Sequence, residues 1–150
     1  MSELNLNSLY QQLILEHYRK PRNKGELPEK TVEVHMANPV CGDEIRLQLQ
    51  VEDDTIVEVR HMGQGCSISQ AAVSMMTHLM KGKDLGEAEG LAARFTEMMH
   101  GDEEAAKDRT MGDLRALQGV SKFPVRIKCA LLAFDALQEA VKRTRGSSNT

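Results

Sequence analysis

Three cysteines are the residues of this 150-residue chain best suited to chemistry. Cys41 lies in the segment 38–43 (NPVCGD), where Pro and Gly predict a loop, and Asp43 brings a carboxylate close to its thiol. Cys66 follows the glycine-rich segment 63–65 at the predicted start of a helix. The positive end of a helix dipole favours negative charge, and the thiolate is the form of cysteine that attacks or binds metals.

The third cysteine, Cys129, lies early in the last predicted helix, away from that helix's large apolar side chains. At about 100° per residue, Cys129 falls about 200° around the helix from Ile127. Its own face carries Arg126 one turn earlier and then small residues, which allow another backbone to approach closely; these are Ala133, Ala136 and Ala140. Arg126, three residues before Cys129, is its neighbour on the helix surface.

Three thiolates and one carboxylate make four donors, a set that suits tetrahedral zinc. Such a site carries a formal charge of −2, so Arg126 and Lys128 are candidate counter-charges, and Arg126 is also a candidate to hold a sulfur substrate. The three thiols lack the close pair that is typical of structural zinc sites. Spacing alone therefore leaves open that each thiol, and Cys129 above all, is an ordinary core residue.

The composition excludes several classes of function. The chain has 27% charged residues and a net charge of −3, so it lacks the basic surface that nucleic-acid binding requires. No apolar run approaches the roughly 18 residues of a membrane helix. The first ten residues lack the basic flank and apolar stretch of a secretory signal. These features predict a cytoplasmic protein without a membrane or nucleic-acid partner, whose three cysteines do not form a disulfide framework.

Hydrophobic periodicity predicts an α+β domain with helices on one face of a three-stranded antiparallel sheet. Alternating residues mark strands near 32–36, 45–51 and 56–62. Helical spacing marks segments near 6–18, 66–80, 85–98 and from Pro124 onward, with a loop over 100–112. The five central methionines are expected in the core; they are Met75, Met76, Met80, Met98 and Met99. One domain is expected over 1–150, with its core near 7–143 and a disordered tail near 146–150.

Several sequence blocks, in this order, resemble the U-type iron–sulfur cluster assembly family. They are EHY at 16–18 with PRN at 21–23, NPVCGD at 38–43, GQGCSIS at 63–69 and VRIKCA at 125–130. Two features resemble the SufU branch of that family. Lys128 stands directly before the last cysteine, where the scaffold branch has His, and an additional stretch covers roughly residues 95–120.

The resemblance implies zinc bound by Cys41, Asp43, Cys66 and Cys129. It also implies a zinc-dependent sulfur-transfer role in SUF-type cluster assembly. Cys41 would accept persulfide sulfur from a SufS-type cysteine desulfurase and pass it to downstream SUF proteins. One alternative is a scaffold that holds a [2Fe–2S] cluster on the same thiols, although a protonated Lys128 cannot bind iron. Another is a purely structural zinc domain.

Overall fold

The computed structural model describes the backbone of residues 2–148 and the side chains of residues 8–146. The elements, in chain order, are α1 (Ser2–Arg19), β1 (Val32–Asn38), β2 (Asp43–Glu52), β3 (Thr55–Gln64), α2 (Ser67–Met80), α3 (Leu85–Met99), α4 (Glu103–Ala106), η1 (Arg109–Lys122) and α5 (Pro124–Ser148). Within residues 2–148, no helix is both long enough and apolar enough to cross a membrane.

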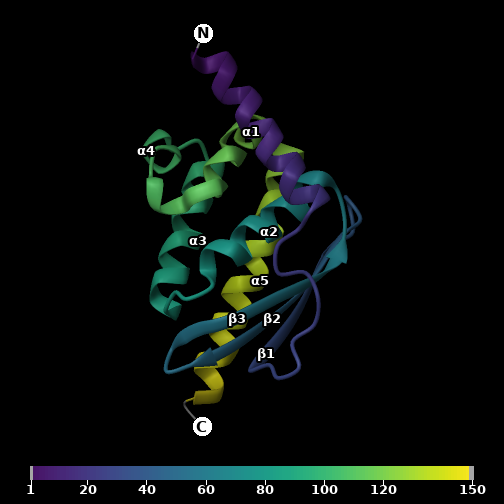
Figure 1. The fold of residues 1–150 in the computed structure, drawn as a ribbon, viewed down its shortest axis with the longest axis vertical. Coiled ribbons are helices and arrows are strands. Elements are labelled where there is room, and N and C mark those ends of the chain that lie inside the picture. Colours follow the sequence, from purple (N-terminus) through teal and green to yellow (C-terminus); the bar gives the residue numbers. More distant parts are fainter. Residues whose placement is uncertain (1, 149–150) are drawn as a thin grey trace.

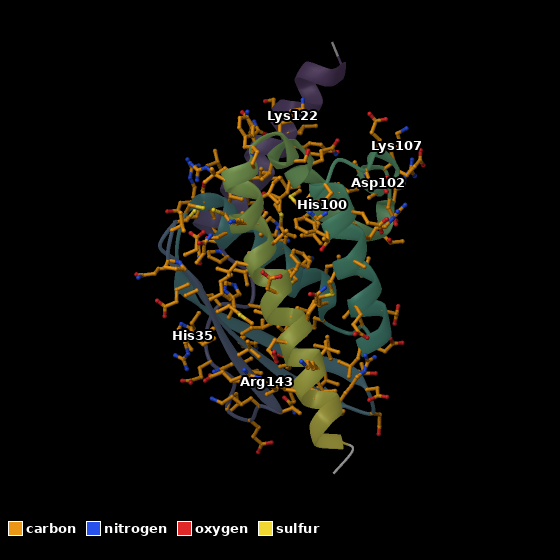
Figure 2. All side chains as sticks on the ribbon, turned by 180° about the vertical axis from the view of Figure 1, so that it is seen from behind. His35, His100, Asp102, Lys107, Lys122 and Arg143 are labelled. Carbon is orange, nitrogen blue, oxygen red and sulfur yellow. The ribbon has the colours of Figure 1, made fainter. Side chains whose placement is uncertain are left out.

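The sheet has the order β1-β2-β3, and both strand pairs are antiparallel. α5 crosses one face of this sheet, contacting β1 and β2, and α2 contacts β3. Figure 1 shows the sheet in front of α5, and Figure 2, from behind, shows α5 in front of the sheet. The predicted α+β class and three-stranded antiparallel sheet are confirmed.

The two-residue turn between β2 and β3 explains how the central hairpin closes. Glu52 pairs with Thr55, and the turn residues Asp53 and Asp54 have φ values of 51° and 62°. Two consecutive positive φ angles characterise the type I′ turn, whose twist matches that of the adjoining strands. The turn therefore fixes the pairing beside it, and a register shift between Gln50 and Val51 changes the pairing farther along the strands.

The predicted alternation along β2 is mostly correct, with one polar exception. Ile45, Leu47 and Leu49 are buried against the helices, as expected. Gln48 lies on the opposite face, which was expected to meet solvent, yet it is also fully buried. The segment after α1 covers it: the Gln48 Oε1 accepts a hydrogen bond of 2.7 Å from the backbone N–H of the buried Leu27.

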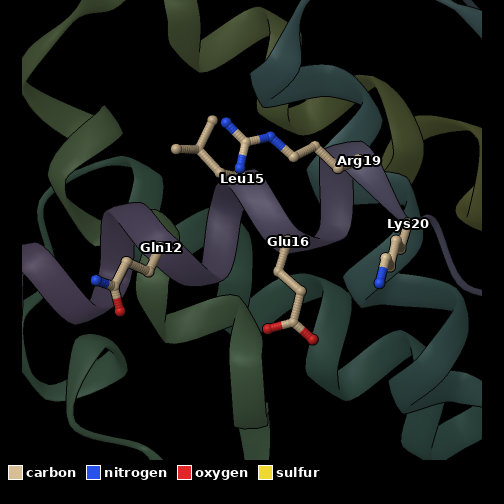
Figure 3. A pocket seen from close by; sticks show the side chains of 5 residues that line it. All are labelled: Gln12, Leu15, Glu16, Arg19 and Lys20. Atoms are coloured by element: carbon tan, nitrogen blue, oxygen red, sulfur yellow. The ribbon is translucent and has the colours of Figure 1, made fainter.

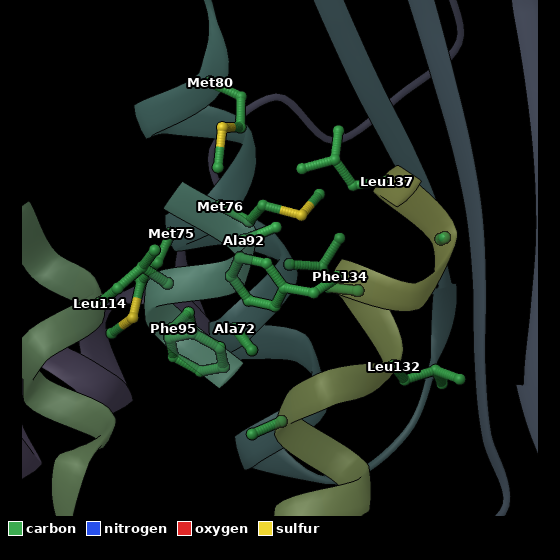
Figure 4. Close-up of a cluster of buried hydrophobic side chains, with 14 of the residues drawn as sticks. Ala72, Met75, Met76, Met80, Ala92, Phe95, Leu114, Leu132, Phe134 and Leu137 are labelled. Carbon is green, nitrogen blue, oxygen red and sulfur yellow. The ribbon is translucent and has the colours of Figure 1, made fainter. Parts of the chain in front are cut away.

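The helical layer is centred on methionine and phenylalanine side chains between α2, α3 and α5. All five methionines predicted to fill the core are buried. The rings of Phe95 and Phe134 stack with their centroids 4.2 Å apart, and Figure 4 shows Met76 beside them. The flexible thioether side chains fill the irregular space around this rigid aromatic pair.

The segment 100–112 is not the irregular loop that its polarity predicted. α4 begins after Asp102, whose carboxylate accepts hydrogen bonds from the Glu104 and Ala105 backbone N–H groups. η1 begins after Asp108, which caps it similarly, and it bends at Gly112, where φ is 53°. Local capping by aspartates and the burial of Met111 thus order a stretch with little hydrophobic periodicity.

The last helix extends further than expected. α5 continues to Ser148, beyond residue 146, where the sequence predicted a disordered tail to begin. Residues 149–150 of that predicted tail lie outside the described residues.

A buried histidine joins α1 to two other helical elements. His17 Nε2 donates to Asp113 Oδ2 of η1 at 2.9 Å, so Nδ1 accepts from the Ser74 hydroxyl of α2 at 2.8 Å. The Ser74 oxygen in turn accepts from the Arg22 backbone N–H at 2.8 Å. Ser74 is fully buried, so this Ser–His–Asp arrangement connects elements and offers no accessible nucleophile.

A His17→Ala substitution is expected to lower the free energy of unfolding by about 2–3 kcal/mol, because it leaves a cavity and removes the acceptor of the buried Ser74 hydroxyl proton. Urea denaturation followed by circular dichroism, at equal metal loading, measures this change. His35→Ala is the matched control, since the His35 side chain is 55% exposed and pairs only with Glu44 at the surface. Equal urea midpoints for the two variants would contradict the connecting role of His17.

A second buried histidine, His61 of β3, holds the segment that follows α1. Its Nε2 donates to the Arg22 carbonyl at 2.9 Å, and its backbone N–H donates to the Asn23 carbonyl at 3.0 Å. Burial lowers the pKa of His61 from 6.5 to about 4, against the raising effect of the Arg22 hydrogen bond, and nearby Lys24 adds to the lowering. Its Nδ1 is buried and has no hydrogen-bond partner among the described residues, as suits a neutral ring.

The burial of neutral His61 predicts a loss of stability in mild acid. The unfolded chain binds a proton at this residue near pH 6.5 and the folded chain only near pH 4. The free energy of unfolding should therefore fall as the pH decreases from 6.5 to 4, by at most roughly 3 kcal/mol. Urea denaturation across this range should give a steeper pH dependence for the unaltered protein than for His61→Gln. Parallel curves would contradict this assignment.

Candidate metal and thiol site

Cys41 lies in the four-residue turn between β1 and β2. Asn38 pairs with Asp43 across the turn, and the Asn38 carbonyl accepts hydrogen bonds from the Cys41 and Gly42 backbone N–H groups at 3.2 and 2.9 Å. Gly42 has a φ of 73°, which glycine adopts without strain. The turn thus presents a half-buried thiol at one end of the sheet.

Asp43, at the start of β2, is held by the junction between β3 and α2. Its Oδ1 accepts hydrogen bonds from the Cys66 backbone N–H at 2.9 Å and from the Ser69 hydroxyl at 3.1 Å. Gly65 makes this approach possible, because a Cβ there would lie 2.5 Å from both the Asp43 Oδ1 and the Ser69 hydroxyl oxygen. The glycines before Cys66 therefore let the two segments meet.

Cys66 is the N-cap of α2, as its sequence position predicted. Its backbone is extended, with φ −69° and ψ 168°, and its Sγ accepts a hydrogen bond from the Ser69 backbone N–H at 3.5 Å. A sulfur in this position faces the positive end of the helix dipole. The helix start thereby favours negative charge at this thiol.

Cys129 is fully buried at the start of α5. Burial raises the pKa of the Cys129 thiol, and interactions with Asp43, Cys41 and Cys66 raise it further. Without a cation nearby, this thiol keeps its proton. A bound metal would reverse the effect, because a thiol that coordinates a metal is deprotonated.

The fold brings together residues that are far apart in the sequence. Donor atoms of Cys41, Asp43 and Cys129 lie within 4.8 Å of one another. Cys66 lies outside this group of three but borders it, since its backbone binds Asp43 and its charge acts on Cys129. The four residues predicted as metal ligands thus form one cluster of three with the fourth beside it.

The donors of this cluster fit a zinc ion. Among the residues that the structure describes, the buried Asp43 Oδ2 has no hydrogen-bond partner, whereas Oδ1 has two. An unpaired buried carboxylate oxygen is costly unless a cation satisfies it. Sulfur and carboxylate donors are ordinary zinc ligands, so Cys41, Asp43, Cys66 and Cys129 would hold the ion.

The predicted cations lie around the cluster and not in it. Arg126 is exposed and lines a groove together with Ser67 and Ile68 of α2. Lys128 is also exposed and lines a smaller hollow that contains Cys41. Within the described side chains, neither cation forms an ion pair, so both are available to an incoming group.

A third hollow, on the outer side of α1, shows no comparable chemistry. Figure 3 shows the side chains that line it: Gln12, Leu15, Glu16, Arg19 and Lys20. None of them is a thiol, and Glu16 already pairs with Arg22. Among the described residues, the side chains suited to binding a metal or attacking a sulfur therefore lie at the cysteines and not in this hollow.

Ser69 is the site residue that the sequence reasoning missed. Its hydroxyl positions Asp43, and its backbone N–H binds Cys66, so one residue contacts two predicted ligands. The available signal was its place three residues after the N-cap, where the backbone N–H turns back toward the capping side chain. Nothing in the spacing indicated that its hydroxyl would reach Asp43.

Comparisons with known proteins identify the family. The family model described as the NifU-like N-terminal domain matches residues 9–130. The chain belongs to this family, which confirms the resemblance seen in its cysteine motifs.

Individual relatives fall on both branches of the family. The zinc-dependent sulfurtransferase SufU of Bacillus subtilis is 47% identical over 96% of this chain and 97% of its own. The iron–sulfur cluster assembly scaffold protein IscU of Streptococcus pyogenes is 40% identical over 99% of this chain and 92% of its own. A crystal structure from Fervidobacterium islandicum, proposed to be a cluster assembly scaffold of the SUF system, has a TM-score of 0.74 at 31% identity. That alignment covers 87% of this chain and 94% of the other.

A Ser69→Ala substitution is expected to weaken zinc binding about tenfold, because groups that orient metal ligands typically contribute that much. Competition with a chromophoric chelator measures the affinity, and the absorption of the cobalt-substituted protein reports a change in ligand geometry. Ser67→Ala is the matched control, since Ser67 lies on the same turn but has no hydrogen bond to Asp43. An unchanged affinity and cobalt spectrum in Ser69→Ala would show that Asp43 needs no such support.

Proposed function

We propose that this protein is a zinc-dependent sulfurtransferase of SUF-type iron–sulfur cluster assembly. In this role Cys41 accepts sulfur from the persulfide of a SufS-type cysteine desulfurase and passes it to downstream SUF proteins. The observation that carries the proposal is the clustering of Cys41, Asp43 and Cys129, with Cys66 alongside. The 47% identity to a zinc-dependent sulfurtransferase supports it.

The positions of the thiols support Cys41 as the acceptor. It is half-buried in a turn with a glycine beside it, next to Val40, which is 84% exposed. Cys129 is fully enclosed, and Cys66 is engaged in capping α2. Cys41 is therefore the half-buried thiol without a capping role, which supports it as the acceptor.

The transfer step needs no oxidant or reductant. The Cys41 thiolate attacks the outer sulfur of the desulfurase persulfide, forming a new S–S bond at Cys41. The S–S bond to the desulfurase cysteine breaks, and that cysteine leaves as a thiolate. The exchange follows the pattern of thiol–disulfide exchange, and Cys41 then carries the persulfide.

Bound zinc would keep the cluster's thiols as thiolates and, having no redox chemistry, would protect them from oxidation. The chain's own residues order the donor set and offer a cation to the persulfide. Asp43 is fixed by Ser69 and the Cys66 backbone, so the donor set is ordered before any sulfur arrives. Arg126 is the candidate to hold the anionic persulfide, because its exposed guanidinium stands one helical turn before Cys129.

A scaffold for a [2Fe–2S] cluster is the second candidate, supported by the 40% identity to a scaffold protein of the family. Three thiolates with Asp43 offer enough donors for such a cluster. Lys128, in the hollow over Cys41, argues against it, because a protonated amine cannot bind iron.

Cys41→Ser tests the acceptor assignment. The unaltered protein is expected to bind about one zinc per chain, consistent with its single set of four donors. It should also raise the turnover of a SufS-type desulfurase without added reductant and gain the mass of one sulfur atom. Cys41→Ser should lose both the stimulation and the mass gain.

The control is Cys129→Ser, which disrupts the metal site but keeps the acceptor thiol. It should show a reduced zinc content and acquire sulfur more slowly, but the sulfur that it gains should be on Cys41, whereas Cys41→Ser should gain none. A Cys41→Ser protein that still carries sulfur would overturn the acceptor assignment. A reconstituted cluster that moves intact to an acceptor protein, with no effect on the desulfurase, would establish the scaffold function instead.

A further inference from the structure

A groove with a volume of about 840 Å³ is lined by Ser67, which follows Cys66 in the sequence, and by Arg126, one helical turn before Cys129. One wall is α1, with Tyr10 and Ile14, and the other is the end of η1 with the start of α5. Ile68, from the first turn of α2, also lines it. The Gln118 side-chain amide donates to the Tyr10 hydroxyl at 3.3 Å, which links the two walls.

The charged residues that line this groove are all basic. No acidic residue lines it, whereas Lys122 and Arg126 do. The segment 114–134 contains four cations and no Asp or Glu, although the whole chain has a net charge of −3. Within the described side chains, Lys122, Arg126 and Lys128 are exposed and form no ion pair. Local charge therefore favours an acidic ligand.

The groove also has an unusually apolar edge. Phe123 is 61% exposed and Val125 is 65% exposed, at the junction between η1 and α5. Phe123 lines the groove, and Val125, two residues further on, lines the hollow that contains Cys41. A large ligand in the groove would therefore cross this edge to reach the acceptor thiol. Exposed aromatic side chains beside cations are typical of protein–protein contacts.

We infer that this groove is the docking site for an acidic segment of the sulfur-donating desulfurase. Its carboxylates would pair with Lys122 and Arg126, and one apolar side chain would lie between Ile14, Ile68 and Phe123. The inference rests on the proposed sulfur-transfer function and adds where the donor binds. It gives the end of η1 a role in selecting the partner.

Lys122 is the residue that separates docking from metal binding. Arg126 and Lys128 lie close to Cys129 in the sequence and also compensate the negative charge of a metal–thiolate cluster. Lys122 belongs to the end of η1 and not to α5. Reversing its charge should therefore change docking without changing the metal content.

The test compares Lys122→Glu and Phe123→Ala with the unaltered protein, each loaded with zinc, in titrations against a SufS-type desulfurase by isothermal titration calorimetry. Lys142→Glu is the matched control. Lys142 is an exposed cation 16 residues beyond Arg126, or about 24 Å along α5. Figure 2 shows Lys122 at one end of the molecule and Arg143, next to Lys142, toward the other.

Lys122→Glu is expected to raise the Kd about tenfold and to reduce its dependence on salt, because rim charges steer association. Phe123→Ala should raise the Kd with the salt dependence unchanged, and Lys142→Glu should leave both unchanged. Zinc content should be equal in all four proteins. Sulfur transfer at saturating desulfurase should match the unaltered protein in Lys122→Glu.

An unchanged Kd in both groove variants, together with intact sulfur transfer, would overturn the docking site and leave the proposed function standing. A lower affinity of equal size in Lys142→Glu would also overturn it, because the effect would then reflect net charge alone. If the unaltered protein does not bind the desulfurase at all, the proposed function is wrong, and a segment of the desulfurase is then not the ligand of this groove.

Discussion

The buried Asp43 carboxylate is the contact on which the geometry of the thiol cluster depends. One of its oxygens binds the Cys66 backbone and the Ser69 hydroxyl, which fixes the start of β2 against the start of α2. This contact requires Gly65, since a side chain there would collide with the Asp43 carboxylate and with the Ser69 hydroxyl. Cys41 lies two residues before Asp43, and the Cys66 backbone N–H donates to the Asp43 carboxylate. Fixing this carboxylate therefore also fixes the positions of two thiols. Cys129 belongs to α5, which crosses the sheet and places this third thiol next to Cys41 and Asp43.

The rest of the fold positions α2, whose start contacts Asp43, and α5, which carries Cys129. The stacked rings of Phe95 and Phe134 join α3 to α5, and His17 joins α1 to α2 and η1. Phe95, Phe134 and His17 are buried, Asp113 is partly exposed, and none of these residues belongs to the thiol cluster. The helical layer therefore acts as a rigid support at one end of the sheet, where the Cys41 turn and the first turns of two helices meet. Catalytic and binding residues commonly lie on loops that a rigid scaffold positions in this way.

Local sequence patterns predicted the elements well where periodicity was strong. The alternation in β2 and the capping position of Cys66 both appear in the structure. The burial of Gln48, the helical turns over 100–112 and the contact of Ser69 with Asp43 were not predicted. Each depends on segments far apart in the sequence or on capping by single aspartates, and neither leaves a repeating pattern. The convergence of Cys129 with Cys41 was likewise not evident from spacing, and only resemblance to a family indicated it.

The differing burial of the three thiols suits holding and transferring sulfur in one site. A thiol that must attack a partner's persulfide has to be reachable, whereas a thiol that only holds a metal is best shielded from oxidants. Cys41, in a turn with a glycine at φ 73°, meets the first requirement. Cys129 meets the second requirement. Its raised pKa means that the thiol keeps its proton unless a cation lies nearby. Cys66 is half-buried like Cys41, but it caps α2, and the helix dipole favours its negative charge. Placing the cysteines on a turn, a helix cap and a buried helix face thus gives three identical side chains three different chemical environments.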